Sequence, residues 1–415
     1  MEGESGRKKG GAPTKRLSET LSKPIVLLAV VVVVAAVTIF FYFGYLSRTT
    51  TTPPQVGRTG GITLPSGFTH SQVVGDLKSP TDMEFAPDGK LFVAEQAGKL
   101  RVVQPDGTLE TFLDFSAKVD SSGERGLQAL AFDPNFSAGN RFVYLLFTSK
   151  ATSTTPAHNR VVRVTARHER TGDNGVVAGS EKLIFQLDTQ DATNHMGGAI
   201  DFGEDGKLYI STGDNETPTN SQKLTNLFGK MLRINKDGTI PIKNPFYSTV
   251  SGNNRAIWAL GLRNPSTFAV QPATGTIFVN DEGEKVWEEI NELEKADNYG
   301  WPVHEGREGD PDFRGPVYAY KHGDTPTRGC SIAGGTFYNP ATPQPLHLPT
   351  EYEGYYFFAD FCNDWIRNYD PTTDKARGFA TGLERLVDLE VSEQGQLYYL
   401  SKDNPGFVGK IGYAG

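Results

Sequence analysis

The sequence predicts an all-β fold, a six-bladed β-propeller, because one hairpin pattern recurs along most of the chain. Each copy has alternating apolar residues, a turn with Asp, Asn or Gly, and a second strand rich in apolar and aromatic residues. The six copies start at Pro80, Gly126, Gly197, Asn264, Gly334 and Leu386. A composition with 46 glycines and 11% aromatic residues fits many turns between short strands. A β-sandwich would not need six copies of one hairpin.

A propeller has to close its ring, and the segment before the first copy is suited to this. The stretch “ITLPSGFTHSQVV” (Ile62–Val74) has the character of a strand. We expect it to pair with “GKIGY” (Gly409–Tyr413) in the last copy and so to join the two ends of the β-rich region. Ligands would then bind at one end of the central channel, on loops between strands.

The N-terminal region differs in character from the rest of the chain. Ile25 to Leu46 is a run of 22 residues without charge, which is long enough to span a bilayer core of ~30 Å. Basic residues concentrate before this run, so the positive-inside rule places the N-terminus in the cytoplasm. A buried core helix is the alternative. We expect a cytoplasmic tail (1–23), an uncleaved transmembrane signal-anchor helix (24–46), a Thr/Pro/Gly linker (47–62) and a periplasmic or extracellular propeller (63–415).

The charge and the cysteines restrict the function further. A formal net charge of -8, without a basic patch interleaved with aromatic residues, argues against nucleic-acid binding. Cys330 and Cys362 are too few for a disulfide-rich scaffold but allow one bridge. Outside the cytosol such a bridge is expected, and two free buried thiols are the alternative.

Three polar residues precede what would be the innermost strands of successive blades. His195, in “NHMGG”, would act as a general base near neutral pH, and the two glycines would let a flat ligand approach the backbone. Arg263, in “GLRNP”, would polarise a carbonyl or hold an anion, or else form an inter-blade salt bridge. Glu124, in “GERGL”, occupies the same place in the preceding blade. Together the three indicate a site at one channel mouth.

An acidic loop follows the fourth copy. In “NDEGEKVWEEINELEKADNYGWP” (Asn280–Pro302), carboxylates alternate with turn residues whose carbonyls are free to bind a cation. Such oxygen donors suit Ca²⁺. A solvated acidic loop is the alternative, and spacing alone favours it.

Several segments together resemble the glucose/sorbosone dehydrogenase family, which includes soluble pyrroloquinoline-quinone (PQQ) glucose dehydrogenases and aldose sugar dehydrogenases. The motifs stand in family order from about Thr63 to the C-terminus. They are “SPTDMEFAPDGKLFVAEQAGKLRVV”, “GERGLQALAFDPNF”, “NHMGGAIDFGEDGKLYISTGDN”, “NLFGKMLRINKDGTIP”, “AIWALGLRNPSTFAV” and “EEINELEKADNYGWP”. The resemblance implies a six-bladed propeller, as the repeats do, and a PQQ- and Ca²⁺-dependent oxidoreductase.

The resemblance also implies roles for single residues. His195 would take the proton of the sugar's anomeric hydroxyl while hydride passes to the quinone, and Arg263 would polarise the reacting quinone carbonyl. Glu124 and Asn194 would contact the sugar. The expected metal residues are Gly283 and Glu284 for the Ca²⁺ that activates PQQ, and Glu289 and Tyr299 for a second ion.

The sequence departs from the family where basic residues of the last two blades bind the carboxylates of PQQ. Here “GGTFYNP” has no basic residue, and “FADFCNDWIRNYD” has only Arg367. Each missing charge-assisted contact would cost ~1.5–3 kcal/mol. The cysteines resemble those of relatives that are not all dehydrogenases, and this likeness implies a Cys330–Cys362 bridge between strands of blade five.

The expected function is oxidation of an aldose or a sugar-containing polymer to a lactone at the anomeric carbon, with hydride transfer to PQQ. An external acceptor would take the electrons, because the chain has no C-x-x-C-H haem motif. A non-catalytic propeller that binds a carbohydrate or protein ligand is the main alternative. A different reaction, such as lactone hydrolysis, is a further one.

Overall fold

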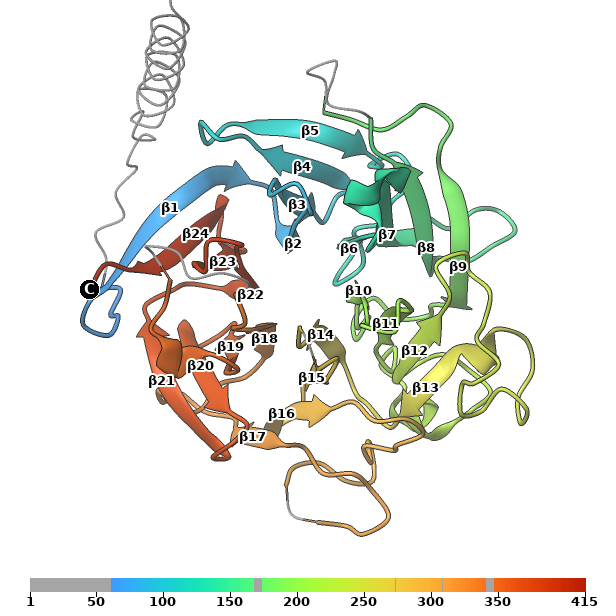
Figure 1. Cartoon of the computed structure of the whole chain (residues 1–415). Coiled ribbons are helices and arrows are strands. Elements are labelled where there is room, and N and C mark those ends of the chain that lie inside the picture. Colours follow the sequence, from blue (N-terminus) through green and yellow to red (C-terminus); the bar gives the residue numbers. More distant parts are fainter. Residues whose placement is uncertain (1–60, 168–173, 273, 308, 341–346) are drawn as a thin grey trace, which may run out of the picture. The chain divides into compact units, whose positions relative to one another are not determined.

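Six four-stranded antiparallel sheets are arranged as blades around a central axis (Figure 1). The computed structural model describes residues 61–167, 174–272, 274–307, 309–340 and 347–415. From the axis outwards, blade one is β2 (Pro80–Phe85), β3 (Leu91–Glu95), β4 (Lys99–Val103) and β5 (Leu109–Asp114). Blade two is β6 (Leu127–Phe132), β7 (Phe142–Ser149), β8 (His158–Thr165) and β9 (Lys182–Thr189). Blade three is β10 (Ile200–Phe202), β11 (Leu208–Thr212), β12 (Lys230–Ile234) and β13 (Ile257–Leu260).

The second half of the ring repeats the same order. Blade four is β14 (Pro265–Val270), β15 (Ile277–Asp281), β16 (Trp287–Glu292) and β17 (Tyr318–Lys321). Blade five is β18 (Ile332–Phe337), β19 (Tyr356–Asp360), β20 (Trp365–Asp370) and β21 (Lys375–Thr381). Blade six is β22 (Leu386–Val391), β23 (Leu397–Ser401), β24 (Gly406–Tyr413) and β1 (Phe68–Leu77). Short helical turns on the connections are η1 (Phe136–Asn140), η3 (Pro218–Gln222), η4 (Gly252–Ala256) and η5 (Thr350–Tyr352). The predicted all-β, six-bladed propeller is confirmed.

The ring is closed by β1, which pairs antiparallel with β24. Phe68 lies opposite Tyr413 and Ser71 opposite Lys410. Blade six therefore combines the first described strand with the last three, as the sequence predicts. Only hydrogen bonds and packing, not chain continuity, hold the ring shut at this blade.

Apolar contacts between blades provide the core. The described residues form six buried hydrophobic clusters, and each lies between one pair of neighbouring blades. Between blades six and one, for example, Met83 and Val93 pack with Leu400 and Val408. Both faces of most strands are buried in this way. Each sheet therefore packs face to face against the sheets of its two neighbours, and the molecule has no single central core.

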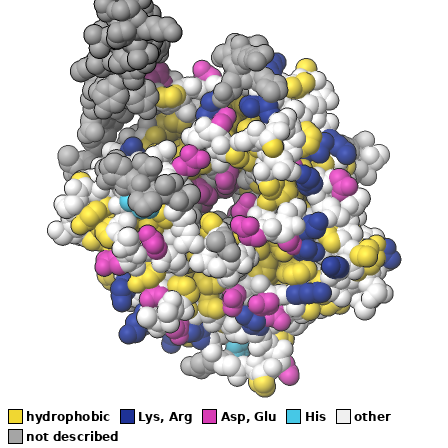
Figure 2. Space-filling model, viewed as in Figure 1, with side chains coloured by type: hydrophobic (Ala, Val, Ile, Leu, Met, Phe, Trp, Pro, Cys, Tyr) yellow, Lys and Arg dark blue, Asp and Glu magenta, His cyan; other side chains and the backbone are white. Residues whose placement is uncertain are grey.

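The innermost strands line a cavity of about 300 Å³ on the axis. Its lining includes carboxylates from three blades, namely Asp82, Glu84, Asp201, Asp388 and Glu390. Figure 2 shows the hollow at the centre of this face, with acidic side chains around it.

The predicted tail and membrane helix lie outside the described residues. Within the described part of the chain, no helix has the length and hydropathy needed to cross a membrane.

Candidate active site

Glu124, His195 and Arg263 lie on the connections that lead into the innermost strands of blades two, three and four. They stand three residues before β6, five before β10 and two before β14. The Nη2 atom of Arg263 lies 3.0 Å from Nε2 of His195. The amide of Met196 donates to Glu124 Oε2 at 3.3 Å. The structure thus brings these three predicted residues to one end of the innermost strands.

The hydrogen bonds of His195 define its tautomer. An arginine only donates, so Nε2 of His195 accepts from Arg263 and the ring proton resides on Nδ1. Nδ1 lies 2.7 Å from Oδ1 of Asp214. The backbone of His195 has a φ of 53°, and its carbonyl accepts from the amide of Asn215 at 3.2 Å. A neutral imidazole with its Nε2 lone pair turned to the site is the form that a general base requires.

Asp214 is a buried carboxylate behind His195. It follows β11, is 0% exposed, and accepts from the indole Nε1 of Trp301 at 2.9 Å through Oδ2. Its own amide donates to the carbonyl of Arg263 at 2.8 Å. One carboxylate oxygen therefore serves Trp301 and the other serves His195, which fixes the imidazole plane.

Gly197 and Gly198 are each required by a close contact with neighbouring residues. A Cβ at Gly197 would lie 2.7 Å from the amide nitrogen of Gly213, and a Cβ at Gly198 would lie 3.1 Å from Nε2 of Gln128. Both glycines have positive φ, 65° and 124°. They let the chain turn sharply between His195 and β10 while it packs against neighbouring strands.

Arg263 spans the boundary between blades three and four without a carboxylate partner for its guanidinium among the described residues. Its Nη1 donates to the carbonyl of Glu282 at 3.0 Å, and its amide donates to the buried Asp281 at 2.9 Å. The guanidinium carbon lies 5.6 Å from the centre of the Trp301 ring. The alternative of an inter-blade salt bridge is therefore not what the structure shows.

Glu282 is an acidic neighbour of the pair that the sequence did not single out. Burial, followed by the charges of Glu124 and Glu288, raises the pKa of its carboxyl to about 8. Its Oε2 accepts from Nδ2 of Asn264 at 3.1 Å. Glu282 consequently carries a proton over much of the neutral range.

The four predicted metal residues fall into two groups. Gly283 and Glu284 continue directly from Glu282, and the amide of Glu284 donates to Oε1 of Glu305 at 2.8 Å. Glu289 is buried and accepts from the amide of Gly306 at 2.6 Å, and burial raises its pKa to about 7. The hydroxyl of Tyr299 donates to the carbonyl of Glu292 at 2.6 Å. The first group lies beside Arg263, whereas the side chains of the second have partners of their own.

Arg367 is not brought to the His195–Arg263 pair. It lies on β20, is 6% exposed, and donates to the hydroxyl of Tyr318 at 2.8 Å. Its guanidinium carbon lies 5.7 Å from the ring centres of both Tyr318 and Trp365. It therefore packs between blades four and five, because the third strand of a blade is remote from the axis.

Arg385 occupies in blade six the position that Arg263 and His195 occupy in their blades. It directly precedes β22, its side chain is exposed, and its guanidinium lies over the Phe361 ring at 4.8 Å. The amide of Lys402 donates to its carbonyl at 2.9 Å. Burial lowers the pKa of Lys402, while Glu124 opposes that shift. The ammonium of Lys402 thus lies within electrostatic reach of Glu124, the acidic residue of blade two.

Asn194 is held by an acidic side chain next to the site. Its Nδ2 donates to Oε1 of Glu216 at 3.1 Å. Asn194 is half-buried and Glu216 is exposed, so this amide stands at the rim rather than in the interior.

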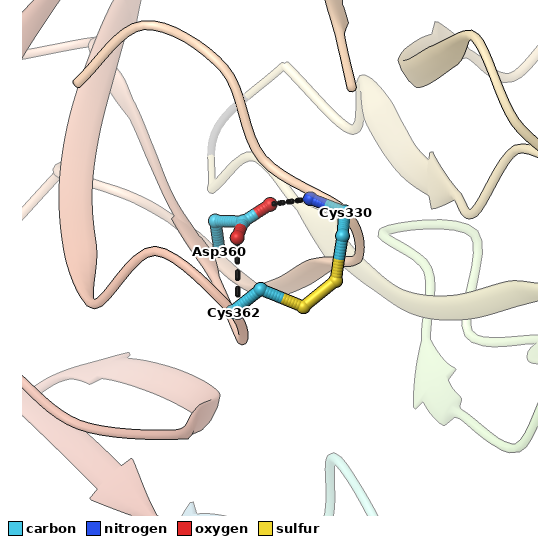
Figure 3. A group of neighbouring side chains, drawn as sticks. All are labelled: Cys330, Asp360 and Cys362. Carbon is cyan, nitrogen blue, oxygen red and sulfur yellow. Dashed lines mark hydrogen bonds between the residues drawn. A yellow bond between two sulfur atoms is a disulfide. The ribbon is translucent and has the colours of Figure 1, made fainter. Parts of the chain in front are cut away.

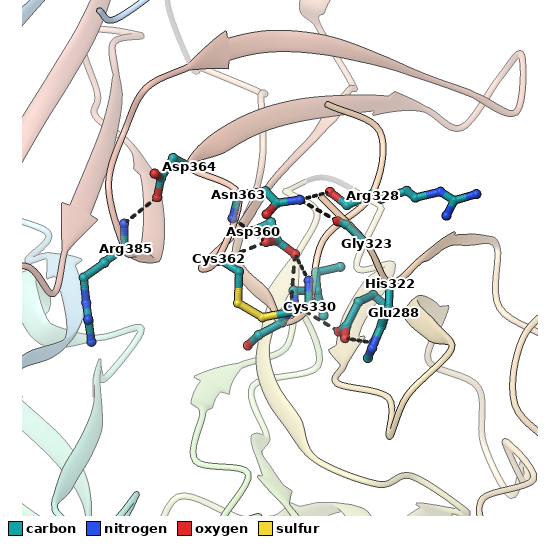
Figure 4. Close-up of a disulfide and its surroundings, with 12 residues drawn as sticks. Glu288, His322, Gly323, Arg328, Cys330, Asp360, Cys362, Asn363, Asp364 and Arg385 are labelled. Carbon is teal, nitrogen blue, oxygen red and sulfur yellow. Dashed lines mark hydrogen bonds and ion pairs between the residues drawn. A yellow bond between two sulfur atoms is a disulfide. The ribbon is translucent and has the colours of Figure 1, made fainter. Parts of the chain in front are cut away.

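Cys330 and Cys362 form the expected disulfide, with their Cα atoms 5.8 Å apart. The bridge joins a residue just before β18 to one just after β19, and Figure 3 shows it beside Asp360. The buried Asp360 accepts from the amides of both cysteines at 3.0 Å. In Figure 4 the bridge lies between Arg385 on one side and Arg328 on the other. Asp360 and the two sulfurs do not make a metal site, since both sulfurs are bonded to each other.

A family model described as Glucose / Sorbosone dehydrogenase matches residues 77–410. The chain belongs to this family. Aldose sugar dehydrogenase YliI of Escherichia coli (strain K12) is 27% identical over 358 residues, which cover 81% of this chain and 90% of that protein. Quinoprotein glucose dehydrogenase B of Acinetobacter calcoaceticus is 28% identical over 268 residues, 59% of this chain and 55% of that protein.

Solved structures share the fold. The PQQ-bound aldose sugar dehydrogenase of Streptomyces coelicolor superposes with a TM-score of 0.69 at 23% identity, over 87% of this chain and 99% of that one. The likeness in fold thus extends over most of the chain.

Sequence reasoning missed Asp214, Trp301 and Arg385 in this member of the family. Arg385 has a recognisable signal, since it stands just before an innermost strand like the residues that were found. Asp214 and Trp301 have a weaker sequence signal. Asp214 lies 19 residues from His195 in the chain, and Trp301 lies 87 residues from Asp214.

Proposed function

We propose that the protein is a PQQ- and Ca²⁺-dependent sugar dehydrogenase that oxidises an aldose, or the reducing end of a sugar polymer, to a lactone. The observation that carries the proposal is the orientation of His195. Asp214 holds Nδ1 at 2.7 Å, and Nε2 is left as the acceptor beside the Arg263 guanidinium. A positioned base next to a cation is what removal of a hydroxyl proton with hydride loss from the same carbon requires.

The chain's own residues would divide the work as follows. His195 Nε2 accepts the proton of the anomeric hydroxyl, and Asp214 stabilises the imidazolium that results. When bound, PQQ supplies the acceptor for the hydride that leaves the same carbon. Arg263 would hold the quinone oxygen that gains negative charge by donating from Nη2, which contacts His195 here, while Nη1 keeps its bond to the Glu282 carbonyl at 3.0 Å. Glu124 and Asn194 bind sugar hydroxyls at the rim.

The residues present fit an anionic cofactor and a hard cation. Arg263 and Arg385 supply positive charge just before the innermost strands of blades four and six, and Lys402 supplies it just after β23 of blade six. These cations are candidates to bind the carboxylates of PQQ in place of Arg367. Around Gly283 the donors are oxygens, namely the carbonyls of Gly283 and Glu284 and the nearby carboxylates, and oxygen donors suit Ca²⁺.

The cellular setting is proposed from the sequence. Residues 24–46 would anchor the chain in a membrane with the propeller outside the cytoplasm, periplasmic or extracellular. Electrons would pass to an external acceptor. The Cys330–Cys362 disulfide supports an oxidising compartment.

A non-catalytic propeller that binds a carbohydrate or protein ligand is the second candidate. The burial of Arg367 between blades favours it, because one expected contact of PQQ is absent. The cations of blade six favour the enzyme instead.

Calorimetry of PQQ binding to the full-length chain in a mild detergent with Ca²⁺, together with a dye-coupled assay over a panel of aldoses, tests the proposal. We expect micromolar or tighter binding, and a loss of turnover of about 10²–10⁴-fold in His195→Ala. His70→Ala, which removes an exposed imidazole on β1, is the matched control and should keep full activity. No binding by the folded chain would contradict the quinone enzyme and favour the binding propeller.

A further inference from the structure

Trp301 contacts both partners of His195, and the proposed chemistry leaves it without a role. Its indole Nε1 donates to Asp214 Oδ2 at 2.9 Å. The guanidinium carbon of Arg263 lies 5.6 Å from the centre of its ring. Trp301 is 9% exposed, so these contacts are sheltered from water. One side chain therefore meets the carboxylate behind His195 and the cation in front of it.

The position of Trp301 is set by a segment of blade four that runs along the outer strand of blade three. A parallel bridge joins Leu260 and Asn298. The backbone bonds of this segment are Leu260 N to Asp297 O at 3.0 Å, Tyr299 N to Leu260 O at 3.0 Å and Trp301 N to Gly261 O at 2.9 Å. Trp301 consequently reaches Asp214 from a neighbouring blade, on backbone that is already paired.

A pair of amide side chains ties the same segment to the Asp214 connection. Gln222 and Asn298 exchange two hydrogen bonds, at 2.9 and 2.7 Å. Gln222 Nε2 also donates to the carbonyl of Trp301 at 2.7 Å. Gln222 ends η3, which follows Asp214 in the chain, so Trp301 and Asp214 are held together by backbone as well as by their own contact.

The chemistry of the indole determines which group donates in the hydrogen bond between Trp301 and Asp214. An indole N–H only donates and does not titrate, so it always needs an acceptor. Asp214 must give it one oxygen, and the remaining oxygen then faces Nδ1 of His195. The ring face, meanwhile, attracts the guanidinium of Arg263.

We propose that Trp301 is a positioning residue for His195. Its N–H holds Asp214 so that the imidazole keeps its proton on Nδ1, and its ring holds Arg263 beside Nε2. The importance of this tautomer for catalysis rests on the proposed function, but the tautomer itself is measurable without any activity.

Trp301→Phe separates the two contacts, because phenylalanine keeps a ring face and loses the N–H. The test uses nitrogen NMR of the imidazoles in the full-length chain, with the His195 signals assigned by comparison with His195→Gln. We expect the parent to show His195 with its proton on Nδ1 and Trp301→Phe to show a second tautomer. In the enzyme assay, kcat should fall about tenfold with KM nearly unchanged, as for one lost hydrogen bond to a buried charge.

Trp301→Leu removes the ring as well and should also weaken PQQ binding by about threefold to tenfold, as for one lost cation–π contact. Trp365→Phe is the matched control. Trp365 is 1% exposed and its Nε1 donates to the carbonyl of Arg328 at 2.9 Å, away from His195. This variant should leave the His195 tautomer as in the parent.

A single Nδ1–H tautomer in folded Trp301→Phe would overturn the proposal. If that variant does not fold, the indole proton of Trp301 in the parent decides: slow exchange with solvent supports the bond to Asp214, and rapid exchange refutes it. A parent that binds no PQQ refutes the proposed function alone, because the NMR result does not depend on the cofactor.

Discussion

Asp214 accepts hydrogen bonds from two side chains that each require an acceptor. Trp301 donates to Oδ2 and His195 donates to Oδ1. In Asp214→Asn the amide retains only one acceptor oxygen. If the indole takes it, the NH₂ group faces Nδ1 and turns the imidazole into the tautomer with its proton on Nε2. The Nε2 proton would then face the N–H donor of Arg263, and the hydrogen bond between the two residues would be lost.

We therefore expect Asp214→Asn to fold normally and to lose about 10²–10⁴-fold in kcat, as for other bases held in the wrong tautomer. Steady-state kinetics and a thermal melt of the variant measure both parts. A variant with parental kcat would show that this carboxylate does not orient the base.

Lys230 lets the connection that carries Asp214 fold back on itself. It is 0% exposed, and its Nζ donates to the carbonyls of Asn220 and Ser221 at 2.9 Å and of Phe228 at 2.5 Å. Burial lowers the pKa of its ammonium to about 7. These three carbonyls belong to the connection between β11 and β12. The ammonium therefore holds together parts of that connection that are separated in the chain.

Lys230→Met should unfold at lower denaturant, with a loss of about 2–4 kcal/mol, because three carbonyls lose their donor. Hydrogen exchange should show faster opening of residues 213–229 than of the other blades. Uniform protection across the propeller would contradict a local role for this lysine. Lys207→Met, on the turn before β11, serves as a surface control.

The disulfide stabilises a second element, the start of blade five. The bonded cysteines are 32 residues apart. Closing a loop of that length in the unfolded chain corresponds to about 3–4 kcal/mol. In urea unfolding, the free energy of unfolding of the double variant Cys330→Ser, Cys362→Ser should be lower by about this amount. The parent protein in reductant should show the same decrease. Equal stability of the oxidised parent and the double variant would mean that Asp360 alone holds the ends of β18 and β19 together.

The carboxylates of the axial cavity make the stability of the whole propeller depend on pH. Burial raises the pKa of Asp388 to about 7 and that of Asp201 to about 6, and burial with neighbouring carboxylates raises those of Asp82, Glu84 and Glu390. In the unfolded chain these groups titrate near pH ~4. The folded state therefore binds more protons between about pH 4 and 7, and its stability is full below that window and falls as pH rises through it.

Urea unfolding at a series of pH values should thus show the greatest stability on the acidic side of neutrality. Asp201→Asn keeps an acceptor for the amide of Phe202 and removes one titrating group, so its decline with pH should be shallower. Asp312→Asn, on an exposed carboxylate, should follow the parent. A parent whose stability is constant from pH 4 to 7 would contradict the raised pKa values.

The blades were predictable because each one repeats the same local rule. Alternation places apolar residues between sheets, and the turn residues mark the hairpins, so six copies could be located without any long-range information. The closing pair of β1 and β24 followed from the requirement that a ring has no free end.

The site was only partly predictable, for a physical reason. Residues that precede innermost strands converge by topology, so Glu124, His195 and Arg263 could be found from their positions alone. Trp301 comes from a connection that crosses to another blade. The glycines after His195 pack closely against Gly213 and Gln128, and no local pattern in the sequence indicates these contacts.

The closing pair also has a consequence in time. Leu77 of β1 pairs with Gly406 of β24, about 330 residues later in the chain. At a synthesis rate of ~5–20 residues per second, β1 emerges from the ribosome roughly 15–65 s before its partner. During that interval one strand edge is exposed and the unfinished ring has no fixed diameter. Nascent chains of this protein should therefore bind chaperones until the last blade is made, and a stalled chain that lacks β24 should aggregate.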